Sequence, residues 1–270
     1  MSNVYIKTKI RSGKTAMDYL GIYKNKTVYI VCDKFMAEYG SVNKVVNAID
    51  SSCRIEIFDQ ALPDPTTEVV GNGLNMGARV QPDIVIAFGG GSAIDTAKGI
   101  IYFGINGGLM KKPIFITIPT TSGTGSEVTS ATVITDVENK SKHLIADDEI
   151  LADVAILDPS LTLSVPPAVT ANTGMDVLTH ALEAYVAKGA NVFSDALSEK
   201  AVELLLDALL VCYRDGGCLE ARSKMHEAST LAGMAFNTAG LGVNHSIAHQ
   251  LGGTFHIPHG LANAMLLTSV

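Results

Sequence analysis

Acidic and imidazole side chains recur at helical spacing in two short stretches of this 270-residue chain. Asp176 and His180 stand four residues apart, so both would face the same side of a helix. A second, apolar and glycine-rich stretch carries His245, His249 and His259. One carboxylate and several imidazoles on facing helices can bind a divalent metal such as Fe(II) or Zn(II). The sequence therefore predicts a metal site made by the two stretches.

The second stretch leaves the ligand set open, because its spacing does not tell which two of His245, His249 and His259 would bind the metal. Gly252 and Gly253 are expected to interrupt the helix, so that His259 would start another one. The remaining histidines show no ligand pattern and are predicted to lie on the surface: His143, His226 and His256.

Strand-like and helix-like segments alternate through the first half of the chain. The expected strands cover residues 5–10, 28–33, 54–58, 83–88 and 114–118. The expected helices cover residues 14–20, 42–49, 66–80 and 93–103. Continuous apolar runs suit the buried strands of a parallel sheet, and this alternation indicates βαβ units. Residues 1–165 are therefore predicted to form an α/β, dinucleotide-binding domain with a doubly wound parallel sheet.

The pattern changes at Pro166 and Pro167, where two prolines break the periodicity. No convincing strand follows them. Helices are expected over residues 168–187, 194–213, 219–237 and 243–251. Residues 166–270 are therefore predicted to form an all-α domain that carries the metal ligands.

A glycine-rich run, residues 89–92, lies between a buried strand and a helix. Backbone amides at such a helix start can receive a pyrophosphate, and glycine lets the phosphate approach closely. The run is not the G-x-G-x-x-G fingerprint, so a standard Rossmann loop is not expected. Residues 119–126, rich in threonine, serine and glycine, add a second set of donors after the next strand. Two such loops favour a dinucleotide over a plain turn.

Asp33 ends the expected strand 28–33. A carboxylate at this position can accept hydrogen bonds from both hydroxyls of an adenosine ribose, and it would repel a 2′-phosphate. Asp33 therefore favours NAD over NADP. The alternative is that Asp33 is only a turn acid after a strand.

Composition excludes several classes of protein. The net charge of −7 argues against nucleic acid or an anionic membrane as the main partner. No apolar run reaches transmembrane length, and the N-terminus lacks the plan of a signal peptide. The cysteines have no zinc-finger spacing and are expected to be reduced thiols in a cytosolic protein: Cys32, Cys53, Cys212 and Cys218.

Together these motifs resemble the iron-containing (group III) alcohol dehydrogenases, whose fold is dehydroquinate synthase-like. The similarity spans the sequence and rests on residues 89–95, 119–129, 174–181 and 245–260. Within the family, three stretches resemble the propanol dehydrogenases of propanediol-utilisation microcompartments: residues 164–176, 248–253 and 259–264. The ethanolamine-associated alcohol dehydrogenases, which act on ethanol, are closely similar.

The resemblance implies an NAD- and iron-dependent enzyme that interconverts a small aldehyde and a primary alcohol, most of all propanal and 1-propanol, with zinc as the alternative metal. The implied metal ligands are Asp176, His180, His245 and His259. His249 would lie beside the nicotinamide and the substrate as a proton-relay or positioning group. The implied cofactor residues are Asp33, Asp64, Gly90, Gly91, Ser92, Thr120, Thr121, Thr124 and Lys142.

The resemblance also implies a homo-oligomer, located in the cytoplasm or inside a bacterial microcompartment, with shell or enzyme partners there. Members of the family usually continue with further helices, so a C-terminally truncated form is expected. One alternative is an enzyme of the same fold resembling glycerol dehydrogenase or dehydroquinate synthase. Another is a non-catalytic remnant that binds metal or nucleotide. The Asp-His-His-His set and residues 119–126 favour the alcohol dehydrogenases.

Overall fold

The computed structural model describes residues 6–139, 141–255 and 257–270. The chain divides into two compact units. A sheet unit comprises Lys7–Thr120 and Ser130–Asp158, and a helical unit comprises Thr121–Thr129 and Pro159–Val270. The sheet unit ends at Asp158, and the helical unit resumes at Pro159. The predicted domain boundary at residue 165 stays a prediction.

The sheet unit is built on six strands in the order β1-β8-β5-β4-β2-β3, and each neighbouring pair is parallel. These strands are β1 (Lys9–Ser12), β2 (Thr27–Asp33), β3 (Arg54–Ala61), β4 (Ile84–Gly89), β5 (Ile114–Pro119) and β8 (Val154–Leu157). All six residues of β4 are buried, as the continuous apolar sequence of that strand predicts. The predicted α/β class with a parallel sheet is confirmed.

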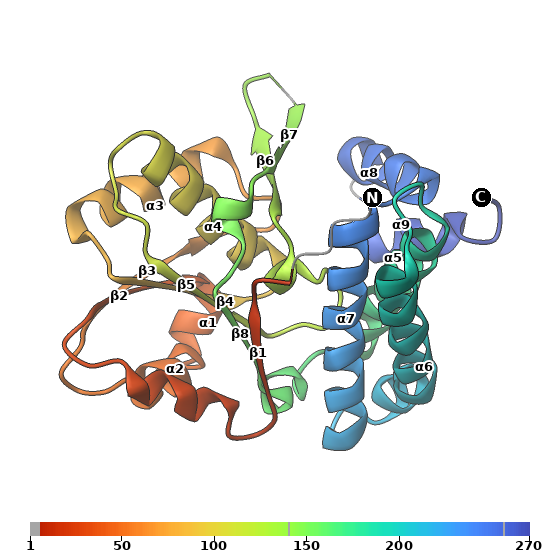
Figure 1. Cartoon of the computed structure of the whole chain (residues 1–270), viewed down its shortest axis with the longest axis horizontal. Coiled ribbons are helices and arrows are strands. Elements are labelled where there is room, and N and C mark those ends of the chain that lie inside the picture. Colours follow the sequence, from red (N-terminus) through yellow and green to blue (C-terminus); the bar gives the residue numbers. More distant parts are fainter. Residues whose placement is uncertain (1–5, 140, 256) are drawn as a thin grey trace. The chain divides into compact units, whose positions relative to one another are not determined.

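Helices cover both faces of this sheet. They are α1 (Lys34–Glu38), α2 (Val42–Ala48), α3 (Thr67–Val80) and α4 (Gly91–Asn106). Figure 1 shows α3 and α4 on one face and α1 and α2 on the other. The core beneath α3 and α4 joins Tyr29, Phe58 and Phe115 of the strands to Ile94 and Ile100 of α4. From β2 the chain adds β3 on one side, and β4 then pairs with β2 on the other side. The strand order therefore reverses between β2 and β4.

Some elements of the sheet unit differ from the sequence-based expectation. Residues 14–20 were expected to be α-helical, but Ala16–Ile22 forms a 3-10 helix, η1. The hairpin of β6 (Ala131–Asp136) and β7 (Ser141–Ala146) had no predicted counterpart. Its two strands pair with each other, and Thr135 of β6 also forms an isolated bridge with Thr66. The strand β8 has only four residues, which is too short for a periodicity to show.

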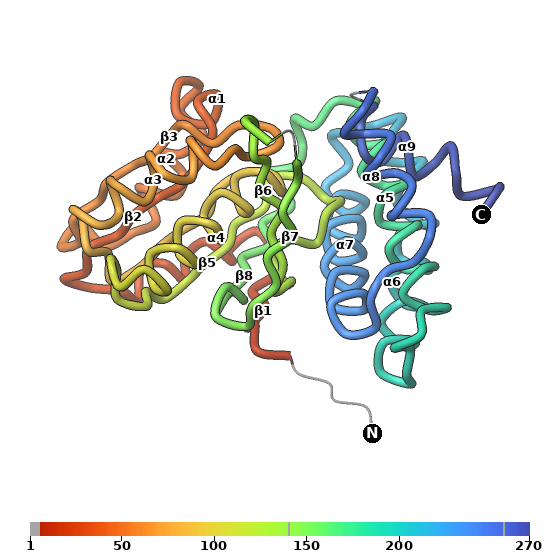
Figure 2. The backbone as a smooth tube through the Cα atoms, turned by 90° about the horizontal axis from the view of Figure 1, so that it is seen from above, coloured from red at the N-terminus to blue at the C-terminus, as the bar shows by residue number. Residues whose placement is uncertain are grey.

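The helical unit contains five α-helices within its described residues: α5 (Pro167–Val186), α6 (Val192–Arg214), α7 (Leu219–Ala239), α8 (Val243–Phe255) and α9 (His259–Leu266). The first three lie side by side in Figure 1 and Figure 2. Alanine dominates their shared core, which lets the helix axes approach closely. A Cβ on Gly174 of α5 would collide with Leu209 of α6.

The expected helix break at Gly252 and Gly253 is wrong, since α8 continues through both glycines to Phe255. Glycine in a helix costs about 1 kcal/mol relative to alanine, which weakens a helix without ending it. The next helix begins only after Pro258, which precedes His259 and caps α9.

Buried Arg222 ties the start of α5 to α7. Its guanidinium donates to the carbonyl oxygens of Val165 and Gly216 and to the hydroxyl of Thr170, at 2.9–3.0 Å. The side chain is 2% exposed, and burial lowers the pKa of the guanidinium. All three acceptors are uncharged, so Arg222 stabilises this junction by hydrogen bonding alone.

We expect Arg222→Met to lower the free energy of unfolding by roughly 2–4 kcal/mol, because three buried acceptors lose their donor. Urea unfolding followed by circular dichroism measures the change. Lys224→Met on the same helix is the matched control, since Lys224 is part-exposed and pairs with the exposed carboxylates of Asp207 and Glu220. Equal midpoints for the two variants would contradict the role given to Arg222.

Candidate metal centre and cofactor edge

Three helices of the helical unit bring one carboxylate and three imidazoles together. Asp176 and His180 come from α5, His245 from α8 and His259 from α9. One donor atom of each side chain lies within 4.8 Å of the others. The first three residues are buried, and His259 is part-exposed. The structure thus brings together the four residues whose ligand role the family resemblance implies.

The spacing of these donors suits a small cation. Oδ1 of Asp176 lies 3.6 Å from Nε2 of His245 and 3.4 Å from Nε2 of His259. Four donors placed tetrahedrally at roughly 2.1 Å from an ion would be about 3.4 Å apart. Imidazole and carboxylate are common ligands of both iron and zinc. The residues present therefore fit a divalent metal.

His180 is held by stacking. Its ring lies between Phe236 and His245, with centroid distances of 4.5 Å on both sides. Within the described part of the chain, its buried Nδ1 has no hydrogen-bond partner. Burial lowers the pKa of His180 to about 3, although Asp176 opposes the shift. The ring is therefore neutral at physiological pH, as a metal ligand must be.

Glu183 orients His245. Its Oε2 lies 2.5 Å from Nδ1 of His245, and its Oε1 accepts the backbone N–H of Asn244 at 2.7 Å. The carboxylate thus caps the first turn of α8 and fixes the imidazole at the same time. A Cβ on Gly242 would lie 2.7 Å from Oε1, so only glycine fits before this turn.

The same carboxylates determine the charge of the site. Burial alone would lower the pKa of His245, but its pairing with Asp176 and Glu183 raises that pKa above its ordinary value. Burial would raise the pKa of Asp176, yet the surrounding imidazoles hold it well below the usual range. Both shifts favour an ionised Asp176, which is the form that binds a cation.

Two residues of this centre were not predicted from the sequence. Glu183 and Asn263 are buried in the site, and the spacing of each from a predicted ligand could have indicated it. Glu183 stands three residues after His180 on α5, and Asn263 stands four residues after His259 on α9. Both positions put the side chain on the face that carries a predicted ligand.

His249 lies one helical turn after His245 on α8 and is exposed. Its ring centroid is 4.9 Å from that of His259. It does not belong to the four-residue group. This position beside the group, but outside it, is compatible with the predicted proton-relay or positioning role.

The loop Thr121–Thr129 packs against α7 within the helical unit. Ser122 Oγ lies 2.9 Å from Nδ1 of His226, and Thr230 donates to Glu127 at 2.7 Å. The predicted surface position of His226 is therefore wrong, since the residue is 2% exposed. His143 is exposed as predicted, and His256 lies outside the described residues.

A glycine pair lets this loop reach the helix. A Cβ on Gly125 would lie 2.6 Å from Cα of Gly233 on α7, and Gly125 has a positive φ of 62°. Thr121 and Thr124 belong to this loop and hence to the helical unit. Much of the threonine- and glycine-rich motif thus serves packing, which its sequence did not reveal.

Several predicted cofactor residues gather at the carboxyl edge of the sheet. Asp33 ends β2, and Gly90 and Gly91 follow β4, at the point where the strand order reverses. This reversal is where open α/β sheets bind ligands. The N-cap of α4 is Gly90, which has no side chain to cap the helix, and the amides at such a helix start can receive a phosphate. Buried Thr120 follows β5 alongside, and its N–H donates to the carbonyl of Gly89.

The carboxylate of Asp33 has two tasks. Oδ1 accepts the N–H of Met36 and caps α1, while a Cβ on Gly89 would lie 3.6 Å from Oδ2. Oδ2 thus faces the start of the glycine run, and the run continues to half-buried Ser92. Farther along the edge, Asp64 and Lys142 form an exposed ion pair at 2.6 Å.

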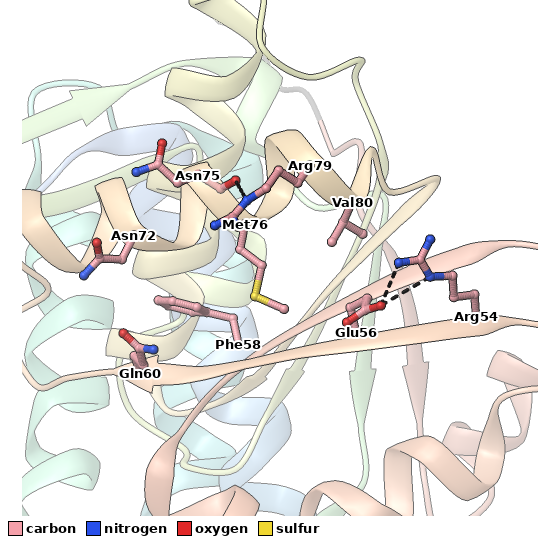
Figure 3. Close-up of a pocket in the computed structure, with 9 residues that line it drawn as sticks. All are labelled: Arg54, Glu56, Phe58, Gln60, Asn72, Asn75, Met76, Arg79 and Val80. Carbon is pink, nitrogen blue, oxygen red and sulfur yellow. Dashed lines mark hydrogen bonds and ion pairs between the residues drawn. The ribbon is translucent and has the colours of Figure 1, made fainter.

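A surface pocket of about 630 Å³ lies elsewhere on the sheet unit, between β3 and α3 (Figure 3). Its two arginines already have partners: Arg54 pairs with Glu56, and Arg79 donates to the carbonyl of Asn75. None of the predicted site residues lines this pocket. We assign it no part in the chemistry.

We expect Glu183→Gln to weaken binding of Zn²⁺ or Fe²⁺ by the four-residue group by roughly 10–100-fold. The amide has a single acceptor oxygen, whereas the two oxygens of the carboxylate accept from His245 and from the first turn of α8. Competition with a chromogenic chelator measures the affinity. Glu203→Gln on α6, where the side chain is 63% exposed, is the matched control. Unchanged affinity in Glu183→Gln would show that the carboxylate does not orient a ligand.

Comparisons with known proteins agree with this architecture. The 1-propanol dehydrogenase PduQ of Citrobacter freundii is 52% identical over 270 residues, which cover 100% of this chain and 73% of the relative. The crystal structure of a 1,3-propanediol oxidoreductase matches with a TM-score of 0.94 at 38% identity, over 99% of this chain and 74% of that one. A sulfoacetaldehyde reductase from Bifidobacterium kashiwanohense, in complex with NAD⁺, matches with a TM-score of 0.92 at 31% identity, over 99% and 75%.

Two family signatures divide the sequence between them. Residues 7–159 match the iron-containing alcohol dehydrogenases, and residues 170–270 match the C-terminal part of the Fe-containing alcohol dehydrogenase family. Together with the fold, these matches show that the chain belongs to the iron-containing alcohol dehydrogenase family.

Proposed function

We propose that this alcohol dehydrogenase interconverts propanal and 1-propanol with NAD(H) and a divalent metal, with iron as the first choice and zinc as the alternative. The observation that carries the proposal is the gathering of Asp176, His180, His245 and His259, with donor atoms within 4.8 Å of one another. The substrate assignment is supported by 52% identity to a 1-propanol dehydrogenase. The cofactor assignment is supported by Asp33 at the sheet reversal and by a structural relative in complex with NAD⁺.

The residues of the metal centre have separate roles in the proposed reaction. A cation held by the four-residue group would polarise the carbonyl oxygen of the substrate, and NAD(H) would supply the hydride. Glu183 would accept the Nδ1–H of His245, and the lone pair that coordinates a metal would then lie on Nε2. Asp176 supplies one negative charge, which lowers the net charge of the site.

Proton balance assigns a role to His249. Reduction of an aldehyde by NADH takes up one proton, which must reach the substrate oxygen. His249 is exposed beside His259 and is not part of the ligand group, so its imidazole is the proposed donor. The reverse reaction would return the proton to the same ring.

The proposed cofactor residues of the sheet unit lie at the carboxyl edge of its sheet. The proposed site uses the N-terminal amides of α4, with Gly90, Gly91 and Ser92, for the pyrophosphate, and Asp33 for the adenosine ribose. The remaining proposed contacts are Asp64, Thr120, Thr121, Thr124 and Lys142. Assembly as a homo-oligomer and a place in the cytoplasm or in a microcompartment are proposals from the resemblance alone. No helix among the described residues is long and apolar enough to cross a membrane.

NADH oxidation dependent on propanal tests the proposed reaction. We expect activity with propanal, and loss of metal and activity together in His259→Ala, because three donors hold a divalent ion less tightly than four. Metal analysis of the purified variant separates the two effects. Full metal occupancy in His259→Ala would remove His259 from the ligand set. A higher kcat/KM for acetaldehyde than for propanal would instead favour an ethanol dehydrogenase.

Cofactor choice tests Asp33. We expect Asp33→Asn to weaken discrimination against NADPH by roughly 1–3 kcal/mol, because the charge that repels a 2′-phosphate is lost. Asparagine retains an oxygen that can cap α1, so the fold should be kept. The ratio of kcat/KM for NADH and NADPH measures the change. An unchanged ratio would show that Asp33 does not face the ribose.

A further inference from the structure

The buried side chain of Asn263 lies among the proposed metal ligands. Its Nδ2 is 2.7 Å from Oδ1 of Asp176, 3.1 Å from Nε2 of His245 and 3.2 Å from Nε2 of His259. The residue is fully buried, and it stands one helical turn after His259 on α9. One amide nitrogen is therefore in contact with three of the four proposed donor residues.

Asn244 fixes which end of this amide faces the ligands. Its Nδ2 donates to Oδ1 of Asn263 at 2.9 Å and to the backbone carbonyl of Asn263 at 3.3 Å. Turning the Asn263 amide around would set an oxygen against the Asp176 carboxylate and two amide nitrogens against each other. The hydrogen-bond network therefore directs the two N–H groups of Asn263 at the ligand group.

These contacts compete with coordination. A neutral imidazole has one lone pair, carried by its unprotonated nitrogen. When the ring of His245 is neutral and its Nδ1–H donates to Glu183, its lone pair lies on Nε2, which faces Asn263. One lone pair cannot accept an amide hydrogen and bind a cation at once. Oδ1 of Asp176 has more than one lone pair and can do both.

We propose that Asn263 is a positioning residue whose amide competes with a cation for the side chains of the metal centre. Its two amide hydrogens are shared among Asp176, His245 and His259, and a bound cation would displace the amide from both histidines. This inference rests on the metal centre of the proposed function. It follows that Asn263 stabilises the metal-free fold and lowers the affinity for metal, while Asn244 acts through it.

Zinc binding by the whole chain tests this inference, with Asn263→Ala, Asn244→Ala and the double variant compared with the wild type. Chelator competition gives the affinity for Zn²⁺, and thermal unfolding with and without Zn²⁺ gives the stability of each form. Asn106→Ala on the exposed face of α4 is the control.

We expect Asn263→Ala to bind Zn²⁺ about tenfold more tightly than the wild type, because two histidine lone pairs lose a competing donor. The midpoint of its metal-free form should fall, and saturating Zn²⁺ should restore most of the loss. Asn244→Ala should shift both quantities in the same direction, and the double variant should go no further than Asn263→Ala. If Asn263→Ala does not fold, Asn244→Ala provides the same comparison.

Weaker or unchanged Zn²⁺ binding in both single variants would overturn the proposal. Equal losses of stability with and without Zn²⁺ would also overturn it, since they would mean that Asn263 contributes to packing in the same way whether or not metal is bound. The visible spectrum of the Co²⁺-loaded protein should be the same in wild type and variants, and a change would mean that Asn263 is itself a ligand. If the wild type binds no Zn²⁺, the metal centre itself is wrong. If the wild type binds Zn²⁺ and the affinity does not rise in the variants, the metal centre is confirmed and the role proposed for Asn263 is wrong.

Discussion

The candidate centre depends on one buried carboxylate, that of Glu183. It links α5 to the first turn of α8 and orients the His245 imidazole with the same two oxygens. Buried charges are costly unless they are paired and hydrogen-bonded, and this one accepts two backbone N–H groups and a ring nitrogen. Without this link, α8 would lose both its cap and the orientation of its candidate ligand.

Close backbone approaches bring the helices near enough for that link. Gly260 lets the start of α9 lie against the backbone of α5 at Asn172, and Gly242 makes room for the Glu183 carboxylate. Gly125 and Gly233 seat the loop before β6 on α7 in the same way. These glycines mark places where two backbones, or a backbone and a carboxylate, leave no room for a Cβ.

Sequence predicted most of the framework and the candidate ligands, for reasons that can be traced to particular residues. Asp176 and His180 share a helical face, and the apolar runs of β2 and β4 have the length and composition of buried strands. Contacts between segments far apart in the chain could not be predicted from the sequence. The burial of His226 depends on Ser122, and the role of Asn263 depends on α5 and α8.

Crystals soaked with Zn²⁺ or Fe²⁺ and measured at the metal absorption edge give the most direct test of the metal centre. We expect one anomalous peak within coordination distance of Asp176, His180, His245 and His259. A peak at other residues, or no peak in this group from crystals shown to contain the metal, would contradict it.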